Sequence, residues 1–277
     1  MSATLYNIAT NHLGLLRSYG RLETDQVDAD VRAILAQADF GGASVTIPLK
    51  RDIMSQLDDL TSEAKAIGAV NTVIPFTNAG GHRGLLGDNT DWIGIRNVIK
   101  ARLPPSLNKF DSCLVIGAGG TARAAIYALH ALGASRIYLF NCTRRSAEEL
   151  VRAIPGANVE LLDTLDVTSA QGPPQSVIVS TVPASATTME EHVPDALFLP
   201  SSLFSADAGV VVDMAYKPAE TPLLRLGKTM AGGKWCSVMG IEVLLEQVYR
   251  QFELWTGRRC PRSVVSKMVL AAYEASA

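Results

Sequence analysis

Two ionisable residues of this 277-residue chain lie in segments that are typical of turns beside strand ends. Lys50 follows a short predicted strand and a proline, and Asp91 precedes a predicted helix. A lysine and a carboxylate in one pocket can exchange a proton with a carbonyl or an alcohol. With Thr46 and Asn71 they would form a polar pocket. The ordinary interpretations are a solvated lysine and an N-capping aspartate.

A glycine-rich turn between a strand and a helix indicates a nucleotide site. The apolar residues Cys113–Ile116 predict a buried parallel strand, and an alanine-rich helical pattern follows the turn. The turn has Gly-x-Gly-x-x-Ala spacing and consists of Gly117, Ala118, Gly119, Gly120, Thr121 and Ala122. Such a turn lets a pyrophosphate approach the backbone and the helix N-terminus. The alternative is a strand–helix turn that binds no cofactor.

The segment after the next predicted strand concerns the choice between NAD and NADP. An acidic residue at that strand end would bind the ribose 2′-hydroxyl of NAD, whereas polar or basic groups accommodate the 2′-phosphate of NADP. Residues 135–147 contain no Asp or Glu. The polar and basic candidates are Asn141, Thr143, Arg144 and Arg145. The segment therefore predicts NADP, unless the two arginines only begin a helix in solvent.

Two further polar residues are candidates for ligand contacts. Tyr216 lies at a predicted strand end, where nucleotide-binding folds hold their ligands. Gln247 lies on a partly apolar face of a long predicted helix, where most glutamines are simply exposed. The aromatic residues of this region are expected to pack in the core or between domains: Trp235, Tyr249, Phe252 and Trp255.

The composition excludes several classes of protein. The chain is 48% apolar and 19% charged, with a net charge of −2, which gives no sign of a basic surface for nucleic acid. Its 4 cysteines are widely spaced, so we expect reduced thiols in the cytoplasm and no zinc site. It has no run of about eighteen apolar residues and no signal-peptide pattern, so we expect neither a membrane span nor a leader.

The candidate residues of the first part of the chain would be positioned by an N-terminal α/β domain, residues 1–103. We expect helices at 5–16 and at 27–36, the second opened by Asp25, with a possible strand at 19–23 between them. Residues 43–50 predict a short strand that runs into a proline-marked turn, and a helix at 52–60 follows. Strands at 68–75 and near 83–87 form a hairpin, and a helix covers 93–101.

Pro104-Pro105 is the expected boundary to a second domain, residues 104–238. Beyond it the pattern alternates, with strands at 113–116, 136–140, 158–162, 177–180 and 210–213 and helices at 121–132 and 146–153. This pattern predicts a doubly wound, Rossmann-type parallel sheet. Residues 239–277 predict two helices, 241–256 and 261–276, that pack back on the first domain. The fold class is therefore α/β.

Six segments, in order, make the chain resemble shikimate dehydrogenase over nearly its whole length. They are Ser44–Lys50, Ile67–Thr72, Gly87–Asp91, Val115–Ala122, Asp213–Pro218 and the helix around Gln247. The resemblance is to the fungal forms, found as the last domain of the pentafunctional arom polypeptide or as a related domain of the quinate-pathway repressor.

The resemblance implies reversible reduction of 3-dehydroshikimate to shikimate with NADPH. Lys50 matches the family's catalytic lysine and Asp91 its partner aspartate. The residues that match groups holding the hydroxyls and carboxylate of the substrate are Ser2, Thr46, Asn71, Tyr216 and Gln247. The resemblance also implies that the chain is part of a larger multidomain polypeptide.

The chain departs from the family pattern at four places. It begins inside the Ser-x-Ser-Pro motif, so the N-terminal strand is expected to be missing from it. Ala3 and Tyr6 stand where the family usually has Pro and His. Cys142 replaces the arginine that holds the 2′-phosphate, which leaves Arg144 or Arg145 to substitute. Val243 stands where a methionine is common.

Two principal hypotheses follow. The first is a cytoplasmic NADP-dependent shikimate dehydrogenase, favoured by Lys50 and Asp91. The second is a ligand-sensing domain of a quinate-pathway repressor, nuclear and with little or no turnover, favoured by Cys142 and Val243. An NAD-dependent quinate/shikimate dehydrogenase is disfavoured because the acidic residue is missing. None of these hypotheses requires this chain to contact nucleic acid directly or to bind a membrane.

Overall fold

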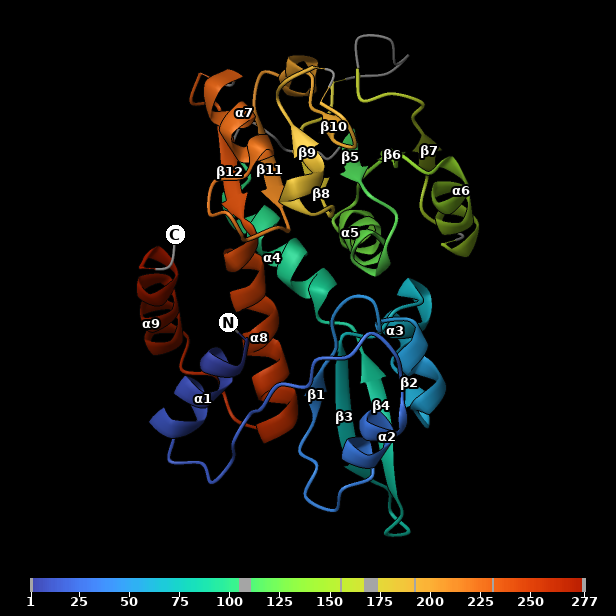
Figure 1. The fold of residues 1–277 in the computed structure, drawn as a ribbon, viewed down its shortest axis with the longest axis vertical. Coiled ribbons are helices and arrows are strands. Elements are labelled where there is room, and N and C mark those ends of the chain that lie inside the picture. The colour runs from blue at the N-terminus through green and yellow to red at the C-terminus, as the bar shows by residue number, and fades with distance from the viewer. Residues whose placement is uncertain are drawn as a thin grey trace. The chain divides into compact units, whose positions relative to one another are not determined.

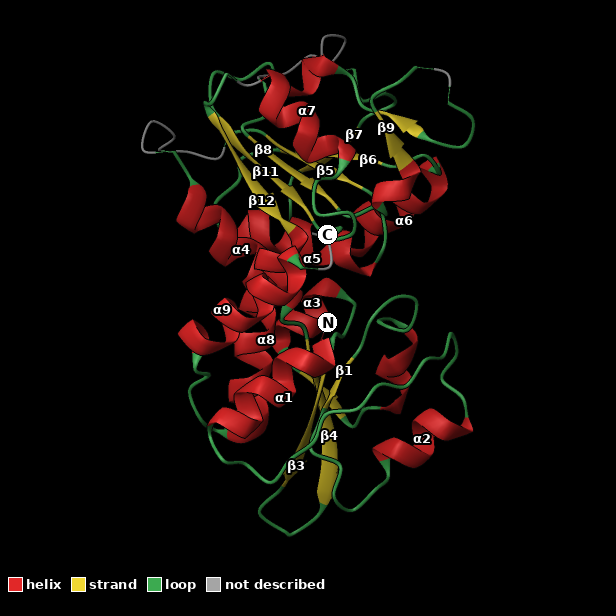
Figure 2. Cartoon of the chain, turned by 60° about the vertical axis from the view of Figure 1, so that its left-hand side comes forward, coloured by secondary structure: helices red, strands yellow, loops and turns green. Residues whose placement is uncertain are grey.

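The computed structural model describes residues 2–104, 111–154, 156–166, 174–191, 193–230 and 232–275 (Figures 1 and 2). The chain forms two compact units. The first comprises Met1–Thr90 and Leu245–Ala277, and the second comprises Asp91–Leu244. The last helices thus belong to the same unit as the N-terminal residues, as expected for the fold class. The predicted domain boundary at Pro104 stays a prediction.

The first unit contains a four-stranded sheet in the order β1-β3-β4-β2. Its strands are β1 (Ala43–Ser44), β2 (Asp59–Leu60), β3 (Thr72–Thr77) and β4 (Arg83–Asp88). β3 and β4 form the predicted antiparallel hairpin. The predicted short strand running into a proline-marked turn is found, since β1 ends at Ser44 and residues 47–50 form a turn, in which Pro48 has no N–H for a sheet ladder. The predicted helix at 52–60 was wrong, since a 3₁₀ helix, Asp52–Gln56, leads there into β2.

The helices of this unit are α1 (Ser2–His12), α2 (Ala29–Leu35), α3 (Ser62–Ile67), the later turns of α8 (Gly240–Thr256) and α9 (Arg262–Glu274). Figure 1 shows α1 and α9 beside α8. The prediction that Asp25 opens α2 was wrong: the carboxylate of Asp28 accepts a hydrogen bond of 3.0 Å from the Val31 N–H and is the N-cap.

The predicted strand at 19–23 is not formed. The side-chain amide of Asn7 takes both backbone groups of Tyr19, with its Nδ2 donating to the Tyr19 carbonyl (3.0 Å) and its Oδ1 accepting from the Tyr19 N–H (2.8 Å). The Tyr19 ring stacks on Tyr6, at 4.3 Å between centroids, and on Trp255, at 5.8 Å. Tyr19 therefore satisfies its backbone N–H and carbonyl and packs its half-buried ring without a partner strand.

The second unit is built on a six-stranded parallel sheet, which confirms the predicted doubly wound fold. Its order is β12-β11-β8-β5-β6-β7. The strands are β5 (Cys113–Ile116), β6 (Ile137–Phe140), β7 (Val159–Leu161), β8 (Val177–Ser180), β11 (Gly209–Asp213) and β12 (Trp235–Met239). The order reverses between β5 and β8, and ligands of such sheets bind at the carboxyl ends of the strands at that switch point.

Helices cover both faces of this sheet. They are α4 (Asp91–Arg102), α5 (Gly120–Ala131), α6 (Arg144–Ala153) and α7 (Pro222–Met230). In Figure 2, α4 and α5 lie on one face and α7 lies on the other. α7 and β12 were not predicted, nor was the small parallel pair β9 (Thr187–Thr188) and β10 (Leu197–Phe198), near the 3₁₀ helices Ala184–Ala186 and Ser201–Phe204. The core beneath α7 contains Leu114, Ile178, Val211, Leu223 and Phe204.

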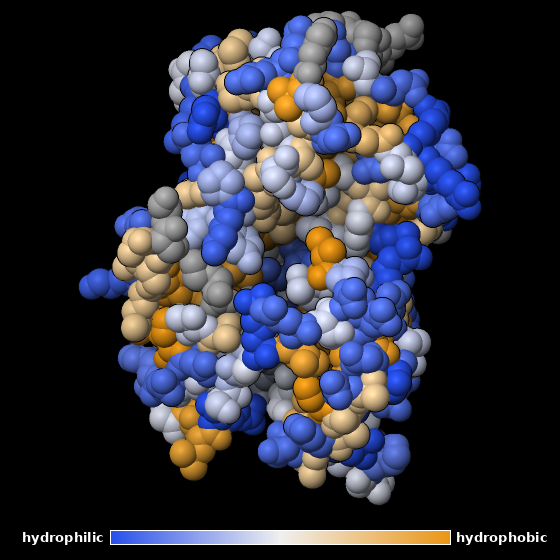
Figure 3. Space-filling view, in the orientation of Figure 1, coloured by the Kyte–Doolittle hydropathy of each residue, from blue (hydrophilic) through white to orange (hydrophobic). Residues whose placement is uncertain are grey.

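On the face seen in Figure 3, polar and apolar residues alternate over short distances. Among the helices that the structure describes, none has the length and apolar character needed to cross a membrane.

Candidate functional site

In the first unit, a buried polar cluster surrounds Asn71. Asn71 lies immediately before β3, and its side chain is 1% exposed. Its Oδ1 accepts hydrogen bonds from the Thr90 N–H (2.7 Å) and the Thr72 hydroxyl (2.6 Å). These donors determine which way the amide faces, so its Nδ2 lies on the opposite side. The Nδ2 donates to Gln247 Oε1 at 2.9 Å.

Gln247 is brought to this cluster by α8. Because its Oε1 accepts from Asn71, its amide nitrogen points elsewhere. Among the described residues Gln247 makes no other hydrogen bond, so this half-buried amide keeps donors for a ligand. The structure thus places the predicted Asn71 and Gln247 side by side, although 176 residues separate them.

Lys50 and Thr46 lie on the turn that follows β1. The Thr46 carbonyl accepts from the Leu49 N–H (2.9 Å), and the Lys50 carbonyl accepts from the Val70 N–H (2.7 Å), which joins this turn to the residue before Asn71. Thr46 is exposed, whereas Lys50 is only 8% exposed. The ordinary interpretation of Lys50 as a solvated lysine is therefore wrong, because its side chain is buried. Such burial is unusual for a lysine.

The segment before Asp91 is held tightly in the first unit. Asp88 Oδ1 accepts from the Thr61 hydroxyl and the Asn89 N–H, both at 2.8 Å, and Asn89 Nδ2 donates to the Ala69 carbonyl at 2.9 Å. Asp91 itself is the first residue of α4, in the second unit, and is 2% exposed. A carboxylate in the first turn of a helix is favoured by the helix dipole.

In the second unit, the glycine-rich turn joins β5 to α5 at the switch point of the sheet. Gly117 has a φ of +109°, and a Cβ there would lie 2.4 Å from Thr181 Oγ1. Gly117 is therefore required by the fold itself. Ala122 is fully buried where α5 packs. The rest of the turn is Ala118, Gly119, Gly120 and Thr121, of which only Gly119 is exposed.

Gly119 is a different kind of glycine. It is the N-cap of α5 with a φ of −83°, and a Cβ built on it would meet no protein atom within 4 Å. Neither the backbone conformation nor packing within the chain requires glycine at this position. The open space lies at the N-terminus of a twelve-residue helix, whose N–H groups and dipole attract phosphate. The turn therefore fits a dinucleotide pyrophosphate.

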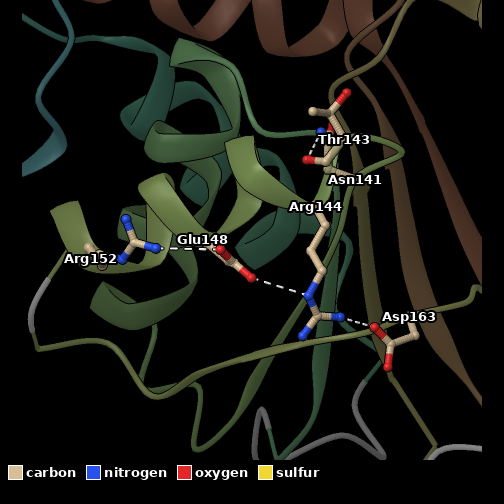
Figure 4. Close-up of polar contacts among 6 residues, drawn as sticks. All are labelled: Asn141, Thr143, Arg144, Glu148, Arg152 and Asp163. Atoms are coloured by element: carbon tan, nitrogen blue, oxygen red, sulfur yellow. Dashed lines mark hydrogen bonds and ion pairs between the residues drawn. The ribbon is translucent and has the colours of Figure 1, made fainter.

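The segment after β6 carries the cofactor-specificity candidates (Figure 4). Asn141 Nδ2 donates to the Thr143 carbonyl at 2.9 Å. The guanidinium of Arg144 binds both Glu148 (3.2 Å) and Asp163. Among the residues that the structure describes, Arg145 pairs with Glu149 alone (3.1 Å), and its side chain is 87% exposed. Arg144 and Arg145 are the first two residues of α6, as in the alternative in which they only begin a helix. Of the two, Arg145 has the more accessible guanidinium.

Tyr216 lies two residues before Pro218, past the end of β11, and is half-buried. Asp213, the last residue of β11, anchors this loop by accepting from the Ala215 N–H at 3.1 Å. Burial raises the pKa of the Asp213 carboxyl, and hydrogen bonds from Thr221, Ala215 and Ser180 partly offset this rise.

The cysteines Cys113, Cys142, Cys236 and Cys260 are all free. In the described part of the chain, no group of at least 3 His, Cys, Asp or Glu side chains is arranged to hold a metal ion.

Comparisons with known proteins agree with this geometry. Residues 1–73 match the shikimate dehydrogenase substrate binding domain, residues 102–217 match shikimate / quinate 5-dehydrogenase, and residues 240–270 match the shikimate 5′-dehydrogenase C-terminal domain. The shikimate dehydrogenase of Aquifex aeolicus is 31% identical, with a TM-score of 0.76 over 97% of this chain and 92% of that one. The chain belongs to the shikimate dehydrogenase family.

Two other members of the shikimate dehydrogenase family are informative. The pentafunctional AROM polypeptide of Malassezia globosa is 46% identical over 100% of this chain, which spans only 17% of that polypeptide. The shikimate 5-dehydrogenase of Thermus thermophilus in complex with NADP(H) and shikimate is 29% identical, with a TM-score of 0.75 over 96% of this chain and 92% of that one. The predicted resemblance to the fungal arom polypeptide is confirmed, and the repressor alternative is not favoured.

The departures from the shikimate dehydrogenase pattern have distinct surroundings. Ser2 begins α1, but its side chain lies outside what the structure describes. Tyr6 is buried, and its hydroxyl donates to Gln251. Cys142 is exposed beside Asn141, whereas Val243 is fully buried in α8.

Sequence reasoning missed three residues that hold the cluster in place: Thr72, Thr90 and Gln251. The available signal was the spacing of Gln251, one helical turn after Gln247.

Proposed function

We propose that this chain is an NADP-dependent shikimate dehydrogenase, which reduces 3-dehydroshikimate to shikimate reversibly. The observation that carries the proposal is the likeness to the Aquifex aeolicus shikimate dehydrogenase over nearly the full length of both chains. The chain contains Lys50 and Asp91, which match the catalytic pair of the family, and the first unit joins Asn71 to Gln247 by a hydrogen bond. The proposal includes membership of a larger polypeptide, since the chain spans 17% of its AROM relatives.

The substrate is proposed to bind the amides of Asn71 and Gln247. Their mutual hydrogen bond orients both groups, so the Gln247 amide nitrogen is held as a donor for a hydroxyl or carboxylate oxygen without first having to be ordered. Thr46, Tyr216 and Ser2 are the further proposed contacts. Shikimate carries three hydroxyls and a carboxylate, so neutral donors suit its hydroxyls. Quinate, which shares these groups, is the proposed second substrate.

Lys50 is the proposed acid–base residue. When bound, NADPH supplies the hydride that reduces the keto carbon. Lys50 donates a proton from Nζ to the oxygen of that carbon and recovers one from it in the reverse direction. Burial of Lys50 supports this role, because a desolvated ammonium interacts strongly with developing negative charge. Asp91 is proposed to stabilise the protonated form of Lys50.

NADPH is proposed to bind at the glycine-rich turn, with its pyrophosphate against Gly119 and the N-terminus of α5. Asn141 and Thr143 would face the adenosine ribose. Arg145 is the proposed main contact of the 2′-phosphate because, in the described part of the chain, two carboxylates hold Arg144 and one holds Arg145. An exposed i,i+4 ion pair is worth only about 0.3–0.5 kcal/mol, so a phosphate can displace Glu149.

The proposed location is the cytoplasm. Four free cysteines fit a reducing compartment. The proposed partners are small molecules, with no direct contact to nucleic acid or membrane.

The proposal is tested by NADPH oxidation with 3-dehydroshikimate, followed by identification of the product. The expected result is shikimate formed in equal amount to the NADPH consumed, with much slower turnover of quinate. If the chain binds shikimate without turning over either substrate, it is a sensor rather than an enzyme.

The cofactor assignment is tested separately with Arg145→Gln and Arg144→Gln. Arg145→Gln should raise the KM for NADPH about tenfold, the scale of one lost charge-assisted hydrogen bond, and leave the KM for NADH unchanged. Equal effects on the two cofactors would show that Arg145 does not contact the 2′-phosphate.

A further inference from the structure

One side chain on α8 connects the proposed substrate-binding amides to the core of the first unit. Gln251 is 0% exposed and lies one helical turn beyond Gln247. Its Nε2 donates to the Thr72 hydroxyl (2.8 Å) and to the Asn71 carbonyl (3.2 Å). Its Oε1 accepts from the hydroxyls of Tyr6 and Ser44. The amide is therefore fully engaged by protein groups and has no contact left for substrate.

These bonds have a direction that ends at the substrate-binding amides. Because Gln251 Nε2 is a donor, the Thr72 oxygen must accept from it, and the Thr72 hydrogen is directed to Asn71 Oδ1 at 2.6 Å. Asn71 Nδ2 in turn donates to Gln247 Oε1. The Thr72 hydroxyl shares Asn71 Oδ1 with the Thr90 N–H (2.7 Å) and the Thr90 hydroxyl (3.1 Å), and its own hydrogen bond is the shortest of the three. The relay therefore runs from Gln251 through Thr72 and Asn71 to Gln247.

The same stripe of α8 offers a matched contact outside this relay. Trp255 lies one further turn along the helix, and its Nε1 donates to the Val73 carbonyl at 2.9 Å. Gln251 and Trp255 thus both attach α8 to β3 or its start. Only Gln251 is connected to the side chains of Asn71 and Gln247. A variant of Trp255 therefore changes the packing of α8 without changing the hydrogen bonds that lead to Asn71 and Gln247, whereas a variant of Gln251 changes both.

We propose that Gln251 is a positioning residue for substrate recognition, which orients the amides of Asn71 and Gln247 through Thr72. This inference rests on the proposed function, because it assumes that those two amides bind shikimate. Gln251 acts on substrate affinity rather than on the chemical step. Its removal leaves Asn71 Oδ1 with the Thr90 N–H and the Thr90 hydroxyl as donors, but takes away the hydrogen bonds from Gln251 to the Thr72 hydroxyl and to the Asn71 carbonyl.

The test measures shikimate oxidation in the full 277-residue chain, with KM for shikimate, KM for NADP⁺, kcat and Tm for each variant. Gln251→Met keeps the side-chain length but removes the amide. It should raise KM for shikimate roughly tenfold, the scale of one neutral hydrogen bond, with kcat and KM for NADP⁺ within about twofold. Trp255→Phe should lower Tm and leave KM for shikimate unchanged.

Thr72 provides a second test that does not depend on the folding of Gln251→Met. Thr72→Val removes the hydroxyl of the relay and should also raise KM for shikimate. Thr72→Ser keeps the hydroxyl and should have the KM of the unchanged protein. The Gln251→Met/Thr72→Val double variant should be little worse than either single variant, because both interrupt one relay.

If Gln251→Met or Thr72→Val lowers Tm but keeps the KM of the unchanged protein for shikimate, the role of Gln251 is packing alone and the proposal is overturned. Failure of the proposed function has a different result. In that case the unchanged protein neither oxidises shikimate nor gains Tm when shikimate is added, and the positioning role falls with it.

Discussion

Replacing glycine by alanine at positions 117 and 119 should separate the needs of the fold from those of the cofactor. At Gly117, alanine would adopt a φ of +109° and place its Cβ 2.4 Å from Thr181 Oγ1 and 3.1 Å from Val182 Cγ1. Backbone strain costs about 1–3 kcal/mol and overpacking about 1–3 kcal/mol more. At roughly 2–4 °C per kcal/mol, Gly117→Ala should lower Tm by about 5–20 °C.

Gly119→Ala should behave in the opposite way. The N-cap of α5 becomes less favourable by about 0.5–1 kcal/mol, but the unfolded chain loses a similar amount of conformational freedom. The two contributions nearly cancel, so Tm should change by no more than a few degrees. The new methyl group fills the open space proposed for the pyrophosphate. Overpacking of about 1–3 kcal/mol corresponds to roughly 10–100-fold weaker NADPH binding.

The assay is a thermal melt and a fluorescence titration with NADPH for both variants. Circular dichroism serves as the control for the fold. NADPH binding by Gly119→Ala as tight as in the unchanged protein would refute the placement of the pyrophosphate. A Gly117→Ala protein as stable as the original would refute the packing argument.

Three further outcomes are expected. Iodoacetamide at neutral pH should alkylate the exposed Cys142 well before Cys113 and Cys260, because burial raises the pKa of those two thiols to about 12. NADP⁺ should slow the alkylation of Cys142. Mass spectrometry of the labelled peptides measures both effects, and no protection of Cys142 by NADP⁺ would place the cofactor elsewhere. The difference in Tm between the unchanged protein and Asp213→Asn should be greatest in acid and shrink towards neutral pH. The pKa of Asp213 is raised in the folded protein, so its stabilising contribution is complete below about 3.8, its pKa when unfolded, and is lost as pH rises through the higher folded value. A difference in Tm that grows with pH would contradict this. Asp28→Ala should destabilise the protein at neutral pH but not in strong acid. The pKa of this N-capping carboxyl is lowered in the folded protein, so its contribution to stability is lost as pH falls through the folded value. A difference in Tm that does not depend on pH would rule out the charged cap.

The nucleotide-binding half of the fold was predictable from local patterns. The strand Cys113–Ile116 was located to the residue, because a strand covered on both faces is apolar throughout and the glycine turn marks its end. β12 was missed, since Ser237 interrupts its apolar run and it pairs only with β11. α7 had a signal that was overlooked, Thr221 before Pro222, where the Thr221 hydroxyl accepts from the Leu224 N–H at 3.3 Å.

The candidate site was predictable as residue types but not as a network. Asn71 and Gln247 were selected from their motifs, and the structure joins them. Gln251 has no local signal that names its partners, because Tyr6 and Thr72 lie 245 and 179 residues away in the sequence. Asp25 and Asp28 show the same limit at short range, since either aspartate could cap α2 and only packing decides between them.

The role of Lys50 as the acid–base residue in the reduction of 3-dehydroshikimate is tested by comparing Lys50→Ala with the unchanged protein. The measurement is kcat for NADPH oxidation at saturating 3-dehydroshikimate, with the KM for NADPH as a control for the cofactor site. We expect a kcat lower by about 10²-fold or more, the scale of lost acid–base catalysis, and an unchanged KM for NADPH. A kcat equal to that of the unchanged protein would show that Lys50 has no part in the proton transfer.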